Sequence, residues 1–232
     1  MIEQATSSTS DSTVTFQQGS AEDLSFLADA SVDLAVAGQA AHWFDYSRAW
    51  PELSRVVKPG GSLAFWGYKD NILIGHRRAN EVFDKFCYVT GEVEPGLQGM
   101  GSYWEQPGRE KLRRLLRDVE PPSSQWGDVQ RIMCDVTSDT TEVPDESEAW
   151  LRKRINLGSF ERYVRTFSSF QAWKDAHPEW KSRAEGGDGN IADILMDRIV
   201  EAEPAWRVMG SAWRDAEVET VWGTFILLAR RK

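Results

Sequence analysis

The chain has 232 residues, enough for one large domain with a sizeable core. Its formal net charge of -9 and pI near 5.0 exclude a nucleic-acid surface, which needs clustered excess Lys and Arg. No apolar run approaches the ~18 residues of a membrane-spanning helix, and no Lys or Arg precedes Arg48 to start a signal peptide. With only Cys87 and Cys134, we expect a cytoplasmic protein without disulfides.

The beginning of the chain predicts alternating strands and helices. Residues 14–16, Val-Thr-Phe, read as a short strand that ends at Gly19. Residues 32–37 form a second strand that is almost continuously apolar, as expected for a strand covered on both faces. The alternation predicts a parallel sheet with crossover helices, which is an α/β fold.

A helix and a third strand are predicted next. Asp45 is a suitable N-cap for a helix whose inward side carries Trp50 and Leu53. Residues 59–61, Pro-Gly-Gly, are expected to end this segment with a turn. Residues 62–67 then read as a strand that returns to the sheet.

The pattern changes between residues 68 and 219, where helices and loops are predicted. Apolar residues recur at helical spacing over residues 79–87, 112–119 and 160–167. The segment 220–229 reads as one more core strand that completes the sheet. We therefore divide the chain into an N-terminal α/β part (1–68), a helical, Trp-rich insertion (69–219) and a returning C-terminal strand (220–232).

Three polar segments interrupt the insertion. The basic run from Arg109 to Arg117 is compatible with a phosphate site, but its apolar partners favour a solvated helix face. The acidic segment 135–148 and the glycine-containing segment 185–190 are interpreted as mobile surface loops. His76 and His177 lack the spacing of a metal site, and no metal is predicted.

Two long stretches carry a family resemblance. These are GSAEDLSFLADASVDLAVAGQAAHWFD, from Gly19 to Asp45, and RVVKPGGSLAFWGY, from Arg55 to Tyr68. They resemble the class I methyltransferases that depend on S-adenosylmethionine, and in particular the methyltransferase type 11 branch with trans-aconitate methyltransferases. The segments YWEQPGR, FERYVRTFSSFQAW and WGTFILLARRK also resemble that branch. The resemblance implies a Rossmann-like sheet and methylation of a small molecule in secondary metabolism. It also implies that residues 1–68 form a partial cofactor-domain core and that residues 69–219 form a lid over the substrate.

The resemblance also implies a cofactor site. S-adenosylmethionine is the implied cofactor, and in doubly wound sheets the ligand lies at the carboxyl ends of the strands. Ala21 together with Glu22 or Asp23 would border the adenine, while Gln39 and Ala40 would line the methionine arm. Read without the resemblance, Glu22 and Asp23 are a turn or helix-start pair.

His42 and Trp43 would face the methyl acceptor. His42 is a candidate catalytic base, but a lone histidine is more often a hydrogen-bonded structural or pocket residue. The predicted substrate-binding residues are His42, Trp43, Tyr68, Trp104 and Trp173. Each tryptophan is equally well explained as core filler. Arg77, Arg78, Arg162 and Arg165 are candidates to pair with an acidic acceptor.

One departure from the family affects the functional prediction. The first strand, the glycine-rich turn and the second strand of the family have no counterpart in residues 1–232, so the expected sheet is incomplete. The first function we consider is methyl transfer to a small-molecule acceptor, with no nucleic-acid or membrane partner. The alternative is a truncated or non-catalytic relative that binds a metabolite or a partner protein.

Overall fold

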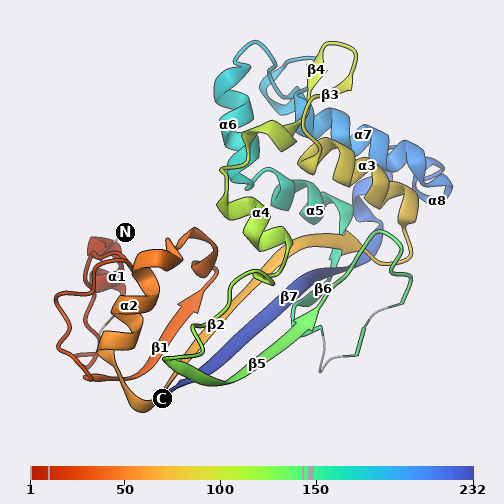
Figure 1. The fold of residues 1–232 in the computed structure, drawn as a ribbon. Helices are drawn as coiled ribbons and strands as arrows, with labels where there is room; N and C mark the ends of the chain where they lie inside the picture. The colour runs from red at the N-terminus through yellow and green to blue at the C-terminus, as the bar shows by residue number, and fades with distance from the viewer. Residues whose placement is uncertain (1, 10, 143, 146–148) are drawn as a thin grey trace. The chain divides into compact units, whose positions relative to one another are not determined.

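The computed structural model describes residues 2–9, 11–142, 144–145 and 149–232 (Figure 1). The chain divides into two compact units. The first comprises residues 1–66, 119–131 and 226–232, and the second comprises residues 67–118 and 132–225.

The first unit is built on two parallel strands and a crossover helix. Strand β1 (Val32–Gly38) pairs in parallel with β2 (Val57–Leu73), and helix α2 (Tyr46–Val56) connects them. The predicted cap is confirmed, because the Asp45 side chain accepts a hydrogen bond from the backbone N–H of Ser47 at 3.0 Å. Trp50 and Leu53 of α2 are buried, as the apolar spacing predicts.

The main sheet has five strands. Its order is β1-β2-β7-β5, with β7 spanning Glu217–Arg231 and β5 spanning Trp126–Cys134. Strand β6 (Arg152–Asn156) pairs with β7 in the antiparallel direction. Figure 1 shows β2, β7 and β5 side by side as long neighbouring strands. The mixed α/β architecture and the C-terminal core strand are both confirmed.

Two expectations for the first unit are wrong. Residues 14–16 form no strand; the segment 11–18 is exposed and follows helix α1 (Ile2–Ser8) without entering a sheet ladder. A strand needs a neighbour for its backbone groups, and none pairs with this segment among the described residues. The predicted turn at residues 59–61 is instead part of β2, where it produces an irregular register with β1. Gly60 has φ +79° there, a conformation that favours glycine.

The second unit contains most of the helices. Its longer helices are α3 (Arg77–Tyr88), α5 (Leu157–Val164), α6 (Ser168–Ala176) and α7 (Ile191–Ala202). Its shorter elements are β3 (Glu92–Glu94), β4 (Leu97–Gln98), α4 (Gly108–Arg113), α8 (Pro204–Arg207) and the 3-10 helices Met100–Tyr103, Arg183–Glu185 and Gly210–Asp215. The inward faces of α3, α5 and α7 share one core that contains Phe83, Phe160 and Leu195. The predicted apolar faces at 79–87 and 160–167 are confirmed.

The prediction of helices and loops alone between residues 68 and 219 is wrong. Strands β5 and β6 lie in this range and join the main sheet, and β3 and β4 form a small antiparallel pair. The predicted helix at 112–119 already ends at Arg113, because Leu115 and Leu116 turn the backbone with positive φ. Both leucines are fully buried, so burial of the turn overrides helix propensity. Part of the predicted acidic loop at 135–148 lies outside the described residues.

Candidate active site

A sharp turn follows strand β1. Gly38 ends the strand, and a Cβ atom at this position would lie 2.9 Å from the Trp66 indole. Gln39 then adopts φ +51°, which is uncommon for a residue other than glycine. Its backbone N–H donates to the Trp66 carbonyl at 2.8 Å. The turn therefore leads the chain away from the carboxyl end of the strand through Ala40.

A one-turn 3-10 helix, Ala41–Trp43, presents the two predicted acceptor residues. Their ring centroids are 4.7 Å apart and the rings are tilted by 47°. His42 is only 5% exposed, whereas Trp43 is 48% exposed. The indole is thus the side chain of this pair that is open to a ligand, and the buried imidazole packs against it.

The loop at residues 20–24 contacts Asp45, two residues after this 3-10 helix. Glu22 Oε1 accepts a hydrogen bond from the backbone N–H of Asp45 at 2.8 Å, and Oε2 accepts one from the Ser20 hydroxyl. Burial acts to raise the pKa of Glu22, but these hydrogen bonds outweigh it, so the pKa lies below its usual value. The structure therefore brings the predicted adenine segment next to the predicted acceptor segment.

Asp23 differs from its neighbour. Its carboxylate is exposed, and Oδ1 accepts a hydrogen bond from the backbone N–H of Ser25 at 3.1 Å. Hydrogen bonds from the side chain and backbone of Ser25 lower the pKa of Asp23, so it is ionised at neutral pH. Of the two acids in this loop, Glu22 holds the backbone and Asp23 presents a carboxylate to solvent. The turn interpretation of Glu22 that the sequence left open agrees with this geometry.

Glu52 also holds the loop at residues 20–24, a role that the sequence analysis did not predict. Its Oε2 accepts a hydrogen bond from the Leu24 backbone N–H at 2.7 Å and forms an ion pair with Arg55 at 2.8 Å. Arg55 in turn donates to the carbonyl of Leu27 at 2.9 Å and pairs with Asp29. The hydrogen bonds from Arg55 and Leu24 lower the pKa of Glu52 to about 2. The i,i+3 spacing of Glu52 and Arg55 was a signal for an ion pair, but not for its attachment to the loop.

The other predicted substrate residues belong to the second unit. Tyr68 is half-buried on β2. Trp104 is half-buried, stacks on Tyr88 with ring centroids 6.0 Å apart, and donates to the Cys87 carbonyl at 2.6 Å. Trp173 has no exposed surface and donates to the Gln98 carbonyl at 2.7 Å. The structure thus places Trp173 in the helical core, and its role in substrate binding stays a prediction.

Arg109 is a buried charge that the sequence interpretation missed. Its guanidinium pairs with Asp70 and lies over the rings of Trp104 (4.1 Å) and Tyr88 (4.8 Å). Its side chain is only 11% exposed, so the expected solvated face of the basic run is wrong at this residue. Burial, with the charge of Arg113, lowers the pKa of Arg109 to about 9, which leaves it charged at neutral pH. Trp104, which precedes Arg109 in the segment YWEQPGR, was the sequence signal from which a buried contact of Arg109 could have been predicted.

Two of the four arginines proposed for an acidic acceptor pair with carboxylates in the chain. Arg165 pairs with Glu161 and Asp193, each at 2.8 Å. Arg77 pairs with Glu81 at 2.9 Å. Their pairing with an acceptor stays a prediction.

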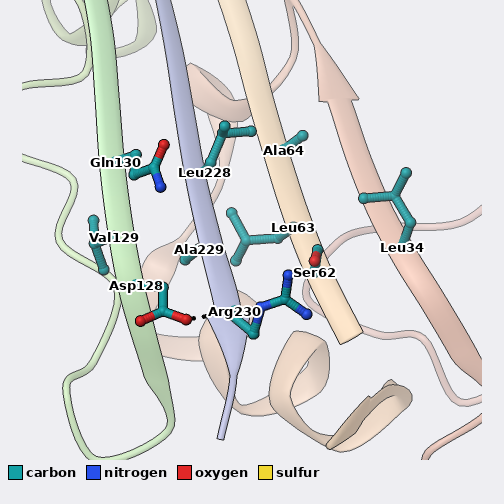
Figure 2. A pocket seen from close by; sticks show the side chains of 10 residues that line it. All are labelled: Leu34, Ser62, Leu63, Ala64, Asp128, Val129, Gln130, Leu228, Ala229 and Arg230. Atoms are coloured by element: carbon teal, nitrogen blue, oxygen red, sulfur yellow. Dashed lines mark ion pairs between the residues drawn. The ribbon is translucent and has the colours of Figure 1, made fainter. Parts of the chain in front are cut away.

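A separate hollow lies on one face of the sheet within the first unit. Its volume is about 510 Å³, and its walls come from β1, β2, β5 and β7. Figure 2 shows Leu34, Ala64 and Leu228 along its length, with Arg230 and Asp128 forming an ion pair at 3.8 Å. The register places Leu34 upstream of Gly38 on β1. Since ligands of doubly wound sheets lie at the carboxyl ends of strands, this hollow is not part of the candidate site.

Comparison with known proteins connects this geometry with one enzyme family. A family model described as a methyltransferase domain matches residues 1–65. The "Probable S-adenosylmethionine-dependent methyltransferase CRG1" of Saccharomyces cerevisiae is 24% identical over 226 residues, covering 96% of this chain and 70% of the yeast protein. An uncharacterized methyltransferase of Mycobacterium tuberculosis is 41% identical over 68 residues, covering 29% of this chain and 28% of that protein.

A solved structure shares the fold of this chain. A structure described as a type II methyltransferase from Anaeromyxobacter dehalogenans superposes with a TM-score of 0.55 at 24% identity, covering 95% of this chain and 73% of that chain. Residues 1–65 thus match a methyltransferase domain, and similarity to a methyltransferase extends over 96% of the chain at 24% identity. The name of the yeast relative gives its cofactor as S-adenosylmethionine, which is therefore the cofactor that the similarity implies.

The match to individual relatives is partial in length. The chain spans 58% of a Dictyostelium discoideum methyltransferase to which it is 24% identical, over 72% of its own residues. Within the described ranges, no three His, Cys, Asp or Glu side chains come together to hold a metal ion. In the part of the chain that the structure describes, no helix is long and apolar enough to cross a membrane.

Proposed function

We propose that this methyltransferase chain binds S-adenosylmethionine at the carboxyl end of β1 and transfers the methyl group to a small-molecule acceptor of secondary metabolism. The observation that carries the proposal is the hydrogen bond between Glu22 and the Asp45 backbone. It joins the segment expected to border the adenine to the segment expected to border the acceptor. A cofactor lying along this edge would reach both segments.

The residues at this edge suit the proposed cofactor. Asp23 offers an ionised, exposed carboxylate that can accept a hydrogen bond from the adenine amine. Ala21 and Ala40 have small side chains that leave room beside the loops. The turn at Gln39 would orient its side chain or backbone toward the methionine arm. S-adenosylmethionine supplies a methyl group bound to a positively charged sulfur.

The acceptor side depends on Trp43 and His42. The exposed indole would give the acceptor an apolar wall, which orients it and keeps water away from the reacting atoms. A carboxylate or thiolate acceptor needs little help from a base at neutral pH. A hydroxyl acceptor would require a group that takes its proton, and we propose His42 for this role, with its buried ring turning toward the acceptor when the acceptor binds.

The proposal is tested with labelled S-adenosylmethionine and the purified chain. The chain is incubated with a whole-cell extract and with the same extract after removal of small molecules by dialysis. We expect label in the small-molecule fraction of the first reaction, and loss of most of it with Trp43→Ala. The control is Val129→Ala, an apolar residue of the first unit that is 41% exposed and lines the separate hollow on the sheet, outside the proposed site. Label transfer only to protein or nucleic acid would contradict a small-molecule acceptor.

A second candidate function has its own observation. Leu34, Val36 and Trp66 expose apolar side chains on the sheet, and Leu34 is 55% exposed. Such surface is typical of an interaction site. A non-catalytic family member that binds a metabolite or a partner protein would be favoured if the folded chain neither binds the cofactor nor transfers a methyl group.

A further inference from the structure

A second hollow lies wholly within the second unit. It is enclosed by the last part of β2, one side of α3, Arg113 and the residues that follow β5. Its volume is about 350 Å³, near the lower end of the range of about 300–1,000 Å³ for small-molecule pockets. The polar residues used below are Lys69, Asp70, Asn71, Asn80, Asp84 and Arg113. We call this hollow the α3 pocket.

Both signs of charge line the α3 pocket, and each charged lining residue has a partner of opposite charge; Glu81, for example, pairs with Arg77 at 2.9 Å. Arg113 pairs with Asp70 at 2.8 Å and with Asp84 at 3.1 Å. Lys69 pairs with Asp135, which lies next to the lining residues. A ligand with a large net charge would therefore leave one charge without compensation, at a cost that rises with burial. A ligand that carries both signs preserves the balance.

The charged groups at the wall remain accessible. The side chain of Arg113 is 38% exposed and that of Asp84 is 51% exposed, so each can bind a second partner. Arginine donates through several N–H groups, and a carboxylate has more acceptor sites than one ion pair uses. A carboxylate on the ligand can thus bind Arg113 while an ammonium group binds Asp84.

Asn71 adds a neutral acceptor. Its side chain is almost fully buried, and Nδ2 donates to Thr220 Oγ1 at 2.8 Å. Its Oδ1 receives no hydrogen bond from any residue within the described ranges. A buried carbonyl without a donor is unfavourable, and a small rearrangement would let a ligand N–H satisfy it. Asn80 differs, since both ends of its amide already bind the backbone of Leu73.

We propose that the α3 pocket binds a small zwitterion of the amino-acid class. The carboxylate lies toward Arg113 and Lys69, and the ammonium group lies toward Asp84 and Asn71. The small volume limits the side chain of the ligand to a few atoms. This binding does not depend on methyl transfer or on the cofactor site in the first unit.

Calorimetric titration of the full chain without S-adenosylmethionine tests the proposal. The probes are L-serine, L-asparagine, succinate and 1,4-diaminobutane. We expect at least one amino acid to bind with a Kd of about 1 mM or tighter, and the dicarboxylate and diamine to bind at least about tenfold more weakly. Absence of amino-acid binding to a folded chain would overturn the proposal, and so would equal binding of succinate or the diamine.

A matched pair of variants locates the binding. Asp84→Asn removes a half-exposed carboxylate that pairs with Arg113, and the expected result is about tenfold weaker amino-acid binding. Asp118→Asn removes a similarly exposed carboxylate that pairs with Arg114 at 2.9 Å outside the pocket, and binding should stay unchanged. Both carboxylates are exposed, so neither change should unfold the chain. Equal affinity in the two variants would exclude the α3 pocket as the binding site.

Discussion

The Glu22 carboxylate accepts a hydrogen bond from the backbone N–H of Asp45 at 2.8 Å. Asp45 is also the N-cap of α2, where its own side chain accepts from the Ser47 backbone. One carboxylate thus fixes the loop before β1 against the start of the helix that follows β1. Because the proposed cofactor would contact both segments, their alignment should control the affinity for the cofactor. Glu22 acts indirectly here, since its carboxylate oxygens already accept hydrogen bonds from Asp45 and Ser20.

We predict that Glu22→Ala lowers both stability and cofactor affinity, whereas Glu22→Gln has the smaller effect. The alanine variant loses two hydrogen bonds, and for a partly exposed carboxylate we expect a loss of about 1 kcal/mol in the free energy of unfolding. Glutamine keeps one oxygen that can accept from Asp45. Urea unfolding followed by circular dichroism measures the difference. Identical unfolding curves for both variants and the parent chain would contradict this role.

The Glu52 interactions predict a specific acid sensitivity. The folded-state pKa of about 2 lies below the value of about 4.3 expected for an unfolded glutamate. The lowered pKa stabilises the folded chain above pH about 4.3, and this contribution disappears as the pH falls toward about 2. The stability difference between the parent chain and Glu52→Gln should therefore be largest near neutral pH and shrink in that acid range. A difference that is constant from pH 7 to pH 2.5 would contradict the assignment.

The pairing of Asp70 with Arg109 predicts a strong asymmetry. Asp70→Asn leaves a buried guanidinium without its carboxylate and should cost about 3 kcal/mol in the free energy of unfolding. Arg109→Met in the Asp70→Asn background removes the unpaired charge and should recover part of that loss. Chemical denaturation of the single and double variants gives the coupling. A double variant less stable than Asp70→Asn would show that the aromatic contacts of Arg109 dominate its contribution.

Two tryptophans should separate core packing from ligand contact. Trp173→Ala removes a fully buried side chain and should cost about 3–5 kcal/mol in unfolding free energy. Trp43→Ala removes a half-exposed side chain, so it should change stability by less than about 1 kcal/mol while lowering methyl transfer. Thermal unfolding and the labelled-methyl assay provide the two readouts. Comparable destabilisation by both changes would contradict the assignment of Trp43 to a ligand-facing position.

The sequence predicted those elements whose patterns are set locally. The apolar run at 32–37, the cap at Asp45 and the 3.6-residue spacing in α3 and α5 all appear in the structure. Each of these depends on periodicity or on contacts within a few residues. The family resemblance added the loops at 20–24 and 39–43, whose proximity no local pattern could show.

The errors come from pairing between distant segments. Val14 has high strand propensity, but it forms no strand because propensity supplies no partner for its backbone. Strand β5 was missed because its burial is irregular and its position depends on pairing within the main sheet. Arg109 was misplaced because helical spacing cannot reveal that Asp70 and two aromatic rings surround it. Burial of charge is decided by tertiary packing, which a single sequence does not display.

The most direct test of the account is calorimetric titration of the folded chain with S-adenosylhomocysteine. We predict binding with a Kd of about 1–100 μM, weakened about tenfold by Asp23→Asn because a neutral amide replaces a charged acceptor. Asp33→Asn removes an exposed carboxylate that pairs with Lys58 at 2.8 Å outside the proposed site and should leave the affinity unchanged. No binding by a chain shown to be folded by circular dichroism would contradict the central claim that the edge formed by Glu22, Asp23 and Gln39 holds the cofactor.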